Sequence, residues 1–112
     1  MVKNYIPKQG DIIYVNLNPA KGHEQQGKRP VIVISKTIFN EHTYMSIVCP
    51  ITSNTKKFPT HYILEDSKKI KGAVLCEHIR SIDFLNRKVE FIEKASDNDL
   101  LSVIALTNAC IE

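Results

Sequence analysis

The segment that most constrains the fold is VIVIS, residues 31–35, a short apolar run rich in β-branched side chains. Such a run is too short for an ordinary helix and does not alternate with polar residues, so it predicts a strand buried on both faces. Just upstream, DIIYVNLN alternates apolar and polar residues from Ile13 to Leu17 and is bounded by Gly10 and Pro19. This pattern is typical of a strand between turns.

Further strands are predicted after the first two. Tyr44–Thr52 forms the third, and Pro50 within it is expected at an edge or a bulge because proline has no N–H to donate. The residues after Ala73–Cys76 are ambiguous, and Glu77–Leu85 is compatible with one or two helical turns. The remaining predicted strands are Thr60–Glu65, Ala73–Cys76 and Arg87–Glu93.

The end of the chain predicts an amphipathic helix. Ser96 is a suitable N-cap, Asp97 and Asp99 favour the first turn, and apolar residues follow with helical spacing to Ile111. About five short strands and one terminal helix predict a mainly β (α+β) fold: a small, partly open β-barrel with a C-terminal amphipathic helix. We expect one domain over residues 1–112.

Composition limits the classes of protein. With 43% hydrophobic and 24% charged residues, the chain has ordinary globular composition. It shows neither a bilayer-spanning run nor a secretory signal, so we expect a cytoplasmic protein that does not enter a membrane. Cys49, Cys76 and Cys110 form no C-x-x-C pair and are expected to be free, buried thiols. No histidine or cysteine cluster has metal-ligand spacing, so neither a metal nor another cofactor is expected.

Basic residues are unevenly distributed. The net charge is only +3, but the segment from Glu90 onward is acidic, so a polyanion would meet the first half of the chain. The basic residues concerned are Lys21, Lys28, Arg29, Lys36, Lys56 and Lys57.

Two polar loops can share one end of the barrel if the first three strands form a meander. GHEQQGKRP (22–30) contains Glu24 and Arg29, and CPITSNTKKFP (49–59), which includes a predicted mobile loop, contains Thr52. Arginine can hold a phosphate and stabilise developing negative charge, a threonine hydroxyl can donate to a phosphate oxygen, and a glutamate can orient the arginine or accept a proton. From spacing alone the structural alternative is favoured: a solvated turn arginine, its surface ion-pair partner and a backbone-bonded threonine.

The loop motif gains weight because it resembles the MazF/PemK family of toxin endoribonucleases. The family pattern GDIxxVxxxPxxGxEQxGxRPxxVxS is matched from Gly10 to Ser35, and two further segments, CPIT (49–52) and GAVLCEHIRSID (72–83), are similar to family segments. The resemblance covers nearly the whole chain.

The resemblance implies a CcdB/PemK-like fold, an SH3-like barrel with a C-terminal helix. It also implies the toxin of a type II toxin–antitoxin system, which cuts single-stranded RNA (mRNA) at specific sequences without a metal; whether mRNA, tRNA or rRNA is the main target is left open by the sequence. Attack by the ribose 2′-OH would leave a 2′,3′-cyclic phosphate and a 5′-OH, and so inhibit translation and growth. The implied partners are a second copy in a homodimer and a MazE-like antitoxin whose acidic, disordered C-terminal tail folds onto the basic cleft.

The same resemblance implies the site residues. Arg29 and Thr52 would be the catalytic pair, supported by Glu24. Because a guanidinium does not readily lose a proton, Arg29 is assigned to the phosphate, and the general base stays open among Glu24, a histidine and water. RNA contacts are expected at Lys21, Gln25, Lys28, Ser53, Lys56, Lys57 and His78.

The histidines carry open alternatives. Glu77-His78 stands where relatives commonly have Asp-Gln, so His78 either contacts an RNA base or is a structural surface residue. His23 can assist proton transfer or be solvated, His61 can face core or cleft, and His42 is expected in a hairpin turn.

A second function is compatible with the same fold. CcdB-type toxins bind DNA gyrase through the C-terminal helix and are not enzymes, so fold alone does not separate the two functions. The polar loop pair distinguishes them, because a gyrase binder has no need of EQxGxRP with a downstream threonine.

Overall fold

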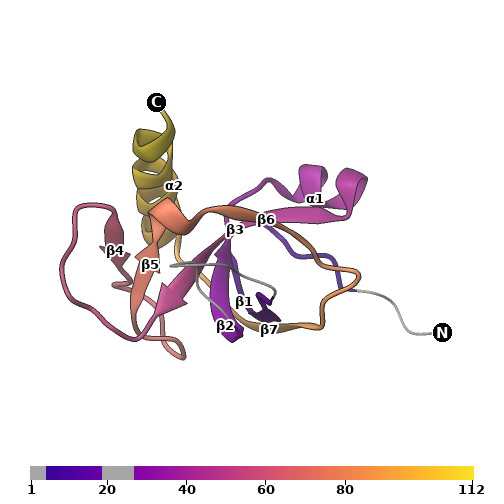
Figure 1. Cartoon of the computed structure of the whole chain (residues 1–112), viewed down its shortest axis with the longest axis horizontal. Coiled ribbons are helices and arrows are strands. Elements are labelled where there is room, and N and C mark those ends of the chain that lie inside the picture. Colours follow the sequence, from indigo (N-terminus) through magenta and orange to yellow (C-terminus); the bar gives the residue numbers. More distant parts are fainter. Residues whose placement is uncertain (1–4, 19–26) are drawn as a thin grey trace.

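A computed structural model describes residues 5–18 and 27–112 of the chain. The elements in chain order are the strands β1 (Asp11–Asn16) and β2 (Lys28–Val33), helix α1 (Thr37–Thr43), strands β3 (Met45–Thr52), β4 (His61–Ile63) and β5 (Ala73–Leu75), the 3₁₀ helix η1 (Cys76–His78), strands β6 (Arg80–Asp83) and β7 (Val89–Lys94), and helix α2 (Asp97–Ile111) (Figure 1). No helix within the described ranges has both the length and the apolar character of a transmembrane span.

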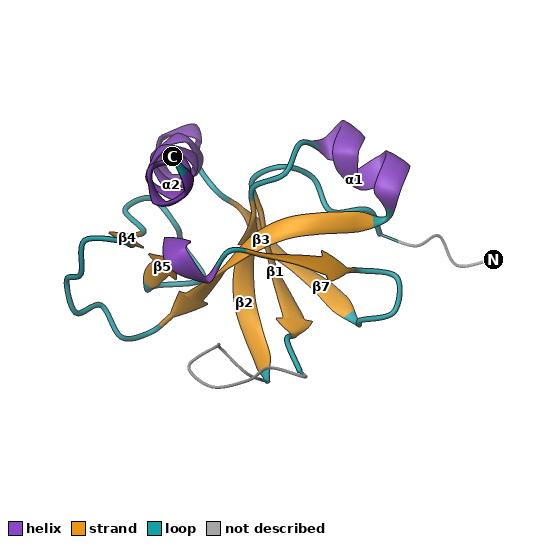
Figure 2. Cartoon of the chain, turned by 45° about the horizontal axis from the view of Figure 1, so that its top comes forward, coloured by secondary structure: helices purple, strands orange, loops and turns teal. Residues whose placement is uncertain are grey.

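The strands form one antiparallel sheet of seven strands in the order β4-β5-β3-β2-β1-β7, with β6 added beside β3. Over the described residues β4 and β7 end this path, so the sheet does not close on itself. The predicted mainly β fold with a C-terminal helix is confirmed, and the open sheet is compatible with a partly open barrel. Helix α1 precedes β3, and the long loop 53–60 leaves the other end of that strand (Figure 2).

Strand β3 pairs with three others. Its residues Met45–Val48 pair with β6, Ile51–Thr52 pair with β5, and Val48–Pro50 pair with β2 on the other side. The expectation that Pro50 would lie at an edge or bulge is wrong, because it lies in the central strand. Proline is tolerated there because it falls between the β6 and β5 ladders, where neither needs its missing N–H.

Alternate residues of the strands fill two separate cores. One core lies under α2, where Ile12, Ile32 and Ile51 meet Leu100 and Val103. The other lies on the opposite face of the sheet and contains Ile13, Val15, Val31, Val33, Val48 and Ile82. Val31–Val33 is fully buried, so the prediction of a strand covered on both faces is confirmed for these three residues, whereas Ile34 and Ser35 lie beyond the end of β2.

Helix α2 begins as predicted. The Ser96 side chain accepts a hydrogen bond from the backbone N–H of Asp99 at 3.0 Å. The Asp99 carboxylate, which is fully buried, accepts the Tyr62 hydroxyl at 2.7 Å and the backbone N–H groups of Glu65 and Asp66 at 3.1 and 3.0 Å. These bonds attach the segment after β4 to the first turn of α2.

Three regions depart most clearly from the predicted elements. Helix α1 occupies residues where a hairpin turn containing His42 was expected. Strand β2 begins at Lys28 rather than Val31, because Lys28, Arg29 and Pro30 pair with β1. The helical alternative for Glu77–Leu85 is wrong beyond η1, since Arg80–Asp83 pairs with β3 as a strand.

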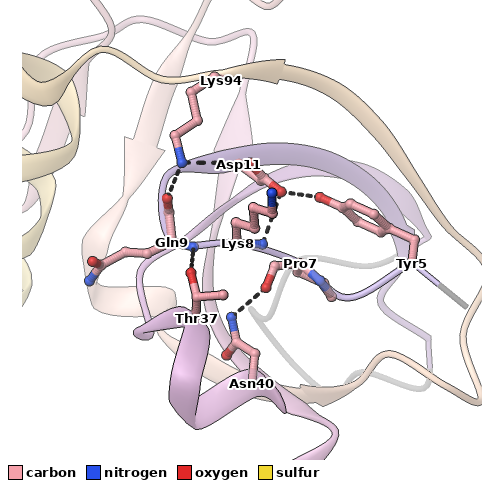
Figure 3. Close-up of polar contacts among 8 residues, drawn as sticks. All are labelled: Tyr5, Pro7, Lys8, Gln9, Asp11, Thr37, Asn40 and Lys94. Carbon is pink, nitrogen blue, oxygen red and sulfur yellow. Dashed lines mark hydrogen bonds and ion pairs between the residues drawn. The ribbon is translucent and has the colours of Figure 1, made fainter.

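A polar network attaches the N-terminal segment to the sheet (Figure 3). The buried Asp11 carboxylate accepts the Tyr5 hydroxyl and, at 2.9 Å, the backbone N–H of Lys8. The pKa of Tyr5 lies above its usual range. The larger cause is partial burial of the hydroxyl, and the second is its hydrogen bond to Asp11. Asn40 of α1 donates to the Pro7 carbonyl at 2.8 Å, so α1 and the segment before β1 are linked.

Glu93 of β7 provides a pH-dependent contribution to stability. Its carboxylate accepts the backbone N–H groups of Lys68, Lys69 and Ile70 at 2.8–2.9 Å. Burial acts to raise its pKa, but these three N–H groups outweigh it and hold the pKa of Glu93 below the ordinary value of 4.5.

We therefore expect Glu93→Gln to destabilise the protein at neutral pH and to have a smaller effect in acid. A carboxyl group with a lowered pKa stabilises the fold above its unfolded-state value and loses that contribution as the pH falls through the folded-state value. Urea unfolding of wild type and variant at pH 7 and pH 3 measures the difference. A gap that stays constant across this range would show that the charge of Glu93 contributes nothing.

Candidate active site

The first three strands form the meander on which the predicted site depends. β1 pairs with β2 and β2 with β3, all antiparallel, so the start of β2 and the end of β3 lie at the same end of the sheet. The predicted residues Lys21, Glu24 and Gln25, with His23, fall in the β1–β2 connection and lie outside the described residues.

Arg29 and Thr52 lie at this common end on the same face of the sheet. The β2–β3 register pairs Val31 with Pro50, and continuing it by two residues places Arg29 opposite Thr52. Because side chains alternate between faces, both point to the face opposite α2. Arg29 is exposed and Thr52 is partly exposed, so both side chains are within reach of a ligand on this face.

The loop after Thr52 is organised by side-chain turns. The Thr52 hydroxyl oxygen accepts the backbone N–H of Asn54 at 3.2 Å, and the Asn54 side-chain oxygen accepts that of Lys56 at 3.0 Å. The predicted RNA-contacting residues Ser53, Lys56 and Lys57 are exposed along this loop. Lys28, at the start of β2, is also exposed, and its ammonium lies 5.4 Å from the centre of the Tyr14 ring.

Two arginines that sequence analysis did not assign to the site hold the base of the β1–β2 connection. Arg80 donates to the Leu17 carbonyl at 3.0 Å, and Arg87 donates to the carbonyls of Asn16 and Asn18 at 2.6 and 2.8 Å. Both arginines are more than sixty residues away in sequence from the carbonyl groups that they bind, so no local sequence pattern predicts these contacts. These hydrogen bonds hold the end of β1 in place, and the chain continues from there toward Glu24.

A second cluster lies beside the site, on β4 and η1. Nε2 of His61 lies 2.8 Å from Oε2 of Glu77, and Nε2 of His78 lies 3.8 Å from the same oxygen. Burial acts to raise the pKa of Glu77, but hydrogen bonds from its own backbone N–H and from His61 hold that pKa below its ordinary value. His78 therefore lies beside a charged carboxylate. The sequence left open whether His61 faces the core or the cleft, and in the structure it faces away from α2.

The face occupied by His61 follows from strand register. Thr52 pairs with Ala73, and Leu75, two residues further along β5, pairs with His61. These four side chains are on one face of the sheet, whereas Val74 and Tyr62 are on the α2 face. His61 therefore lies on the same face of the sheet as Thr52. The sequence could not predict this, because it shows only that His61 follows a loop.

All three cysteines are free, as predicted, but only Cys49 and Cys76 are buried. The expectation that Cys110 is buried is wrong, because it lies exposed near the end of α2. Among the described residues no three His, Cys, Asp or Glu side chains are placed to hold a metal ion.

Comparison with known proteins agrees with this geometry. Residues 8–107 match the family model described as the PemK-like, MazF-like toxin of type II toxin–antitoxin systems. The endoribonuclease toxin MazF of Escherichia coli K12 is 37% identical over 82 residues, which cover 73% of each chain. The endoribonuclease MazF of Staphylococcus saprophyticus is 37% identical over 101 residues, covering 86% of this chain and 83% of that protein.

Solved structures show the same likeness. The crystal structure of MazF from Deinococcus radiodurans has a TM-score of 0.90 and 32% sequence identity, with 96% of this chain and 98% of that chain covered. MazF in a MazE–MazF complex from the same organism has a TM-score of 0.83 at 32% identity, covering 96% and 97%.

The match over residues 8–107, together with the small open β-sheet and its C-terminal helix, places the chain in the class of toxins of type II toxin–antitoxin systems. Within that class, the chain belongs to the PemK/MazF family.

Proposed function

We propose that this protein cuts single-stranded RNA, such as mRNA, at specific sequences by attack of a ribose 2′-OH on the adjacent phosphorus, leaving a 2′,3′-cyclic phosphate and a 5′-OH. The broader assignment, a MazF-like endoribonuclease toxin, follows from the family and from relatives of 33–37% identity that are named endoribonucleases. The gyrase-binding alternative is not favoured, since none of these matches points to it.

The observation that carries the proposal is the shared end and face of Arg29 and Thr52. A guanidinium that is always charged can hold the scissile phosphate and stabilise the extra negative charge on phosphorus in the transition state. The Thr52 hydroxyl can donate to a second phosphate oxygen. Glu24 completes the catalytic set, and the chemistry requires no metal because the charge is supplied by the protein.

Substrate contacts are proposed around this pair. The cations of Lys21, Lys28, Lys56 and Lys57 attract the RNA backbone, and Gln25, Ser53 and His78 supply hydrogen bonds. Because the nucleophile is the 2′-OH, the protein would act on RNA and leave DNA intact. Cleavage of mRNA would block translation and growth in the cytoplasm.

Two protein partners are proposed. Deinococcus MazF has been solved with MazE, and a MazE-like antitoxin with an acidic, disordered tail is compatible with the exposed cations Arg29, Lys56 and Lys57. A homodimer is proposed from the same family relationship.

The test is cleavage of a long single-stranded RNA and of the matching DNA, in EDTA, by wild type and Thr52→Ala. We expect cutting of RNA only, with cyclic phosphate at the new 3′ ends, and a loss of about 10²-fold in the variant, as when one transition-state hydrogen-bond donor is removed. Thr43→Ala, in α1 at the other end of β3, serves as the control. RNA left intact by folded, antitoxin-free protein would contradict the proposal, and so would 3′-phosphate ends formed without a cyclic intermediate.

A further inference from the structure

Phe58 is an exposed aromatic side chain that belongs to neither of the two hydrophobic cores. Its side chain is 57% exposed, and its ring contacts the His61 ring with the centres 5.0 Å apart and the planes tilted by 39°. The two rings line a pocket of about 510 Å³, together with Lys57, Pro59, Tyr62, Ile63 and Glu65. Pockets of this volume hold small ligands in many proteins.

The two rings are held in place by the backbone around them. The His61 N–H donates to the Phe58 carbonyl at 3.0 Å, which closes a four-residue turn with Pro59 at its second position, where proline is favoured. The Cys76 N–H donates to the Thr60 carbonyl at 3.1 Å. The aromatic pair is therefore part of a fixed turn attached to η1.

Glu77 fixes the imidazole from the other side. Its carboxylate, one-third exposed, lies 2.8 Å from Nε2 of His61. A ring held by a hydrogen bond loses less rotational freedom when a ligand stacks on the assembly. Since Phe58 covers one side of His61 and Glu77 anchors its edge, the pair is preorganised.

The position of Phe58 and His61 relative to Thr52 indicates the class of ligand that the two rings would bind. β4 is two strands from β3, a separation of about 10 Å, and His61 lies on the same face of the sheet as Thr52. Lys56 and Lys57 precede Phe58 and are exposed. An aromatic surface beside lysines is typical of sites for single-stranded nucleic acids, where bases stack and cations contact phosphates.

We propose that Phe58 and His61 form a stacking platform for one unpaired nucleobase of the RNA, within a few nucleotides of the phosphate at Thr52. The proposal rests on the RNA-cleaving function above and deepens it. The platform supplies affinity that is equal in ground and transition states, so its loss raises KM and leaves kcat unchanged. Glu77 acts as a positioning residue for His61.

The probe is a 2′-O-methyl copy of a cleaved RNA segment, which has no nucleophile, with 2-aminopurine at successive positions. For wild type we expect fluorescence quenching at one position near the cleavage site. Phe58→Leu keeps the apolar character but removes the ring, so we expect the quenching to disappear and the affinity to fall about tenfold, whereas Phe58→Tyr keeps both. Phe91→Leu on β7, 50% exposed in wild type, is the matched control and should bind normally.

The outcomes separate the two proposals. If wild type cuts RNA but Phe58→Leu binds and quenches like Phe91→Leu, the platform is wrong and the nuclease function stands. If Phe58→Leu loses self-association or binding of an acidic antitoxin while RNA affinity is unchanged, the surface is a protein interface and the platform is also wrong. If wild type neither cuts RNA nor binds the probe, the proposed function itself fails.

Discussion

Replacing Arg29 with alanine should lower kcat/KM for RNA cleavage by about 10²- to 10³-fold while the protein stays folded. The guanidinium supplies the permanent positive charge at the phosphate, and removal of a single group that stabilises developing charge has an effect of this size. The side chain is exposed at the start of β2, so its loss leaves both cores intact. Arg29→Lys keeps the charge but loses the planar two-pronged donor, and an intermediate rate is expected.

The control for this variant is Lys36→Ala. Lys36 is an exposed cation just after β2, at the end remote from Thr52, so its removal lowers the net charge equally without touching the site. Initial rates on one RNA at fixed ionic strength measure the difference. Equal rates for Arg29→Ala and Lys36→Ala would show that only general charge matters at this position.

Gly72→Ala should lower both stability and activity. A Cβ at this position would lie 2.2 Å from the Thr52 carbonyl oxygen and 3.0 Å from the carbonyl carbon. Both atoms are backbone, so relief requires β5 to move away from the end of β3. We expect a loss of about 3 kcal/mol in the free energy of unfolding, the upper part of the range for added volume in a packed site, and reduced cleavage because Thr52 moves with its strand.

Gly27→Ala is the comparison for this variant. A Cβ on Gly27 meets nothing within 4 Å, although its φ of +76° disfavours alanine, so a cost of about 1 kcal/mol is expected. Thermal unfolding and RNA cleavage are measured for both variants. A Gly72→Ala protein that melts and cleaves like wild type would mean that the strands separate without cost.

Elements with strong local signals were predictable from the sequence. The Ser96 cap, the acidic first turn and the apolar spacing give the limits of α2, and the Val31–Val33 run gives the interior of β2. Helix α1 was missed because its local signals are weak: it has no side-chain cap hydrogen bond, and it depends on Asn40, whose side chain bonds to Ser35 at 2.5 Å and to the Pro7 carbonyl. Strand β6 was missed because its partner, Met45–Val48, is distant in sequence.

The candidate site was predictable only through the family motif. Arg29 and Thr52 stood out because EQxGxRP and CPIT are similar to family segments, and the strand register then supports their proximity. The His61–Glu77 pair joins residues on different elements through the β4–β5 ladder, so neither residue has a local signal. Arg80 and Arg87 donate hydrogen bonds to backbone carbonyls. Every residue has such a carbonyl, so the sequence does not indicate which ones the arginines bind.

The pairing of β1 with β7 has a consequence for how this chain folds during its synthesis. β1 needs Val89–Lys94 as its second neighbour, and the core under α2 needs Leu100 and Val103. During synthesis residues 89–103 leave the ribosome after β1, β2 and β3, so the end of the sheet that carries Arg29 and Thr52 cannot be completed before they are made. A nascent chain would therefore lack the complete sheet around the proposed site until residues 89–103 have been added.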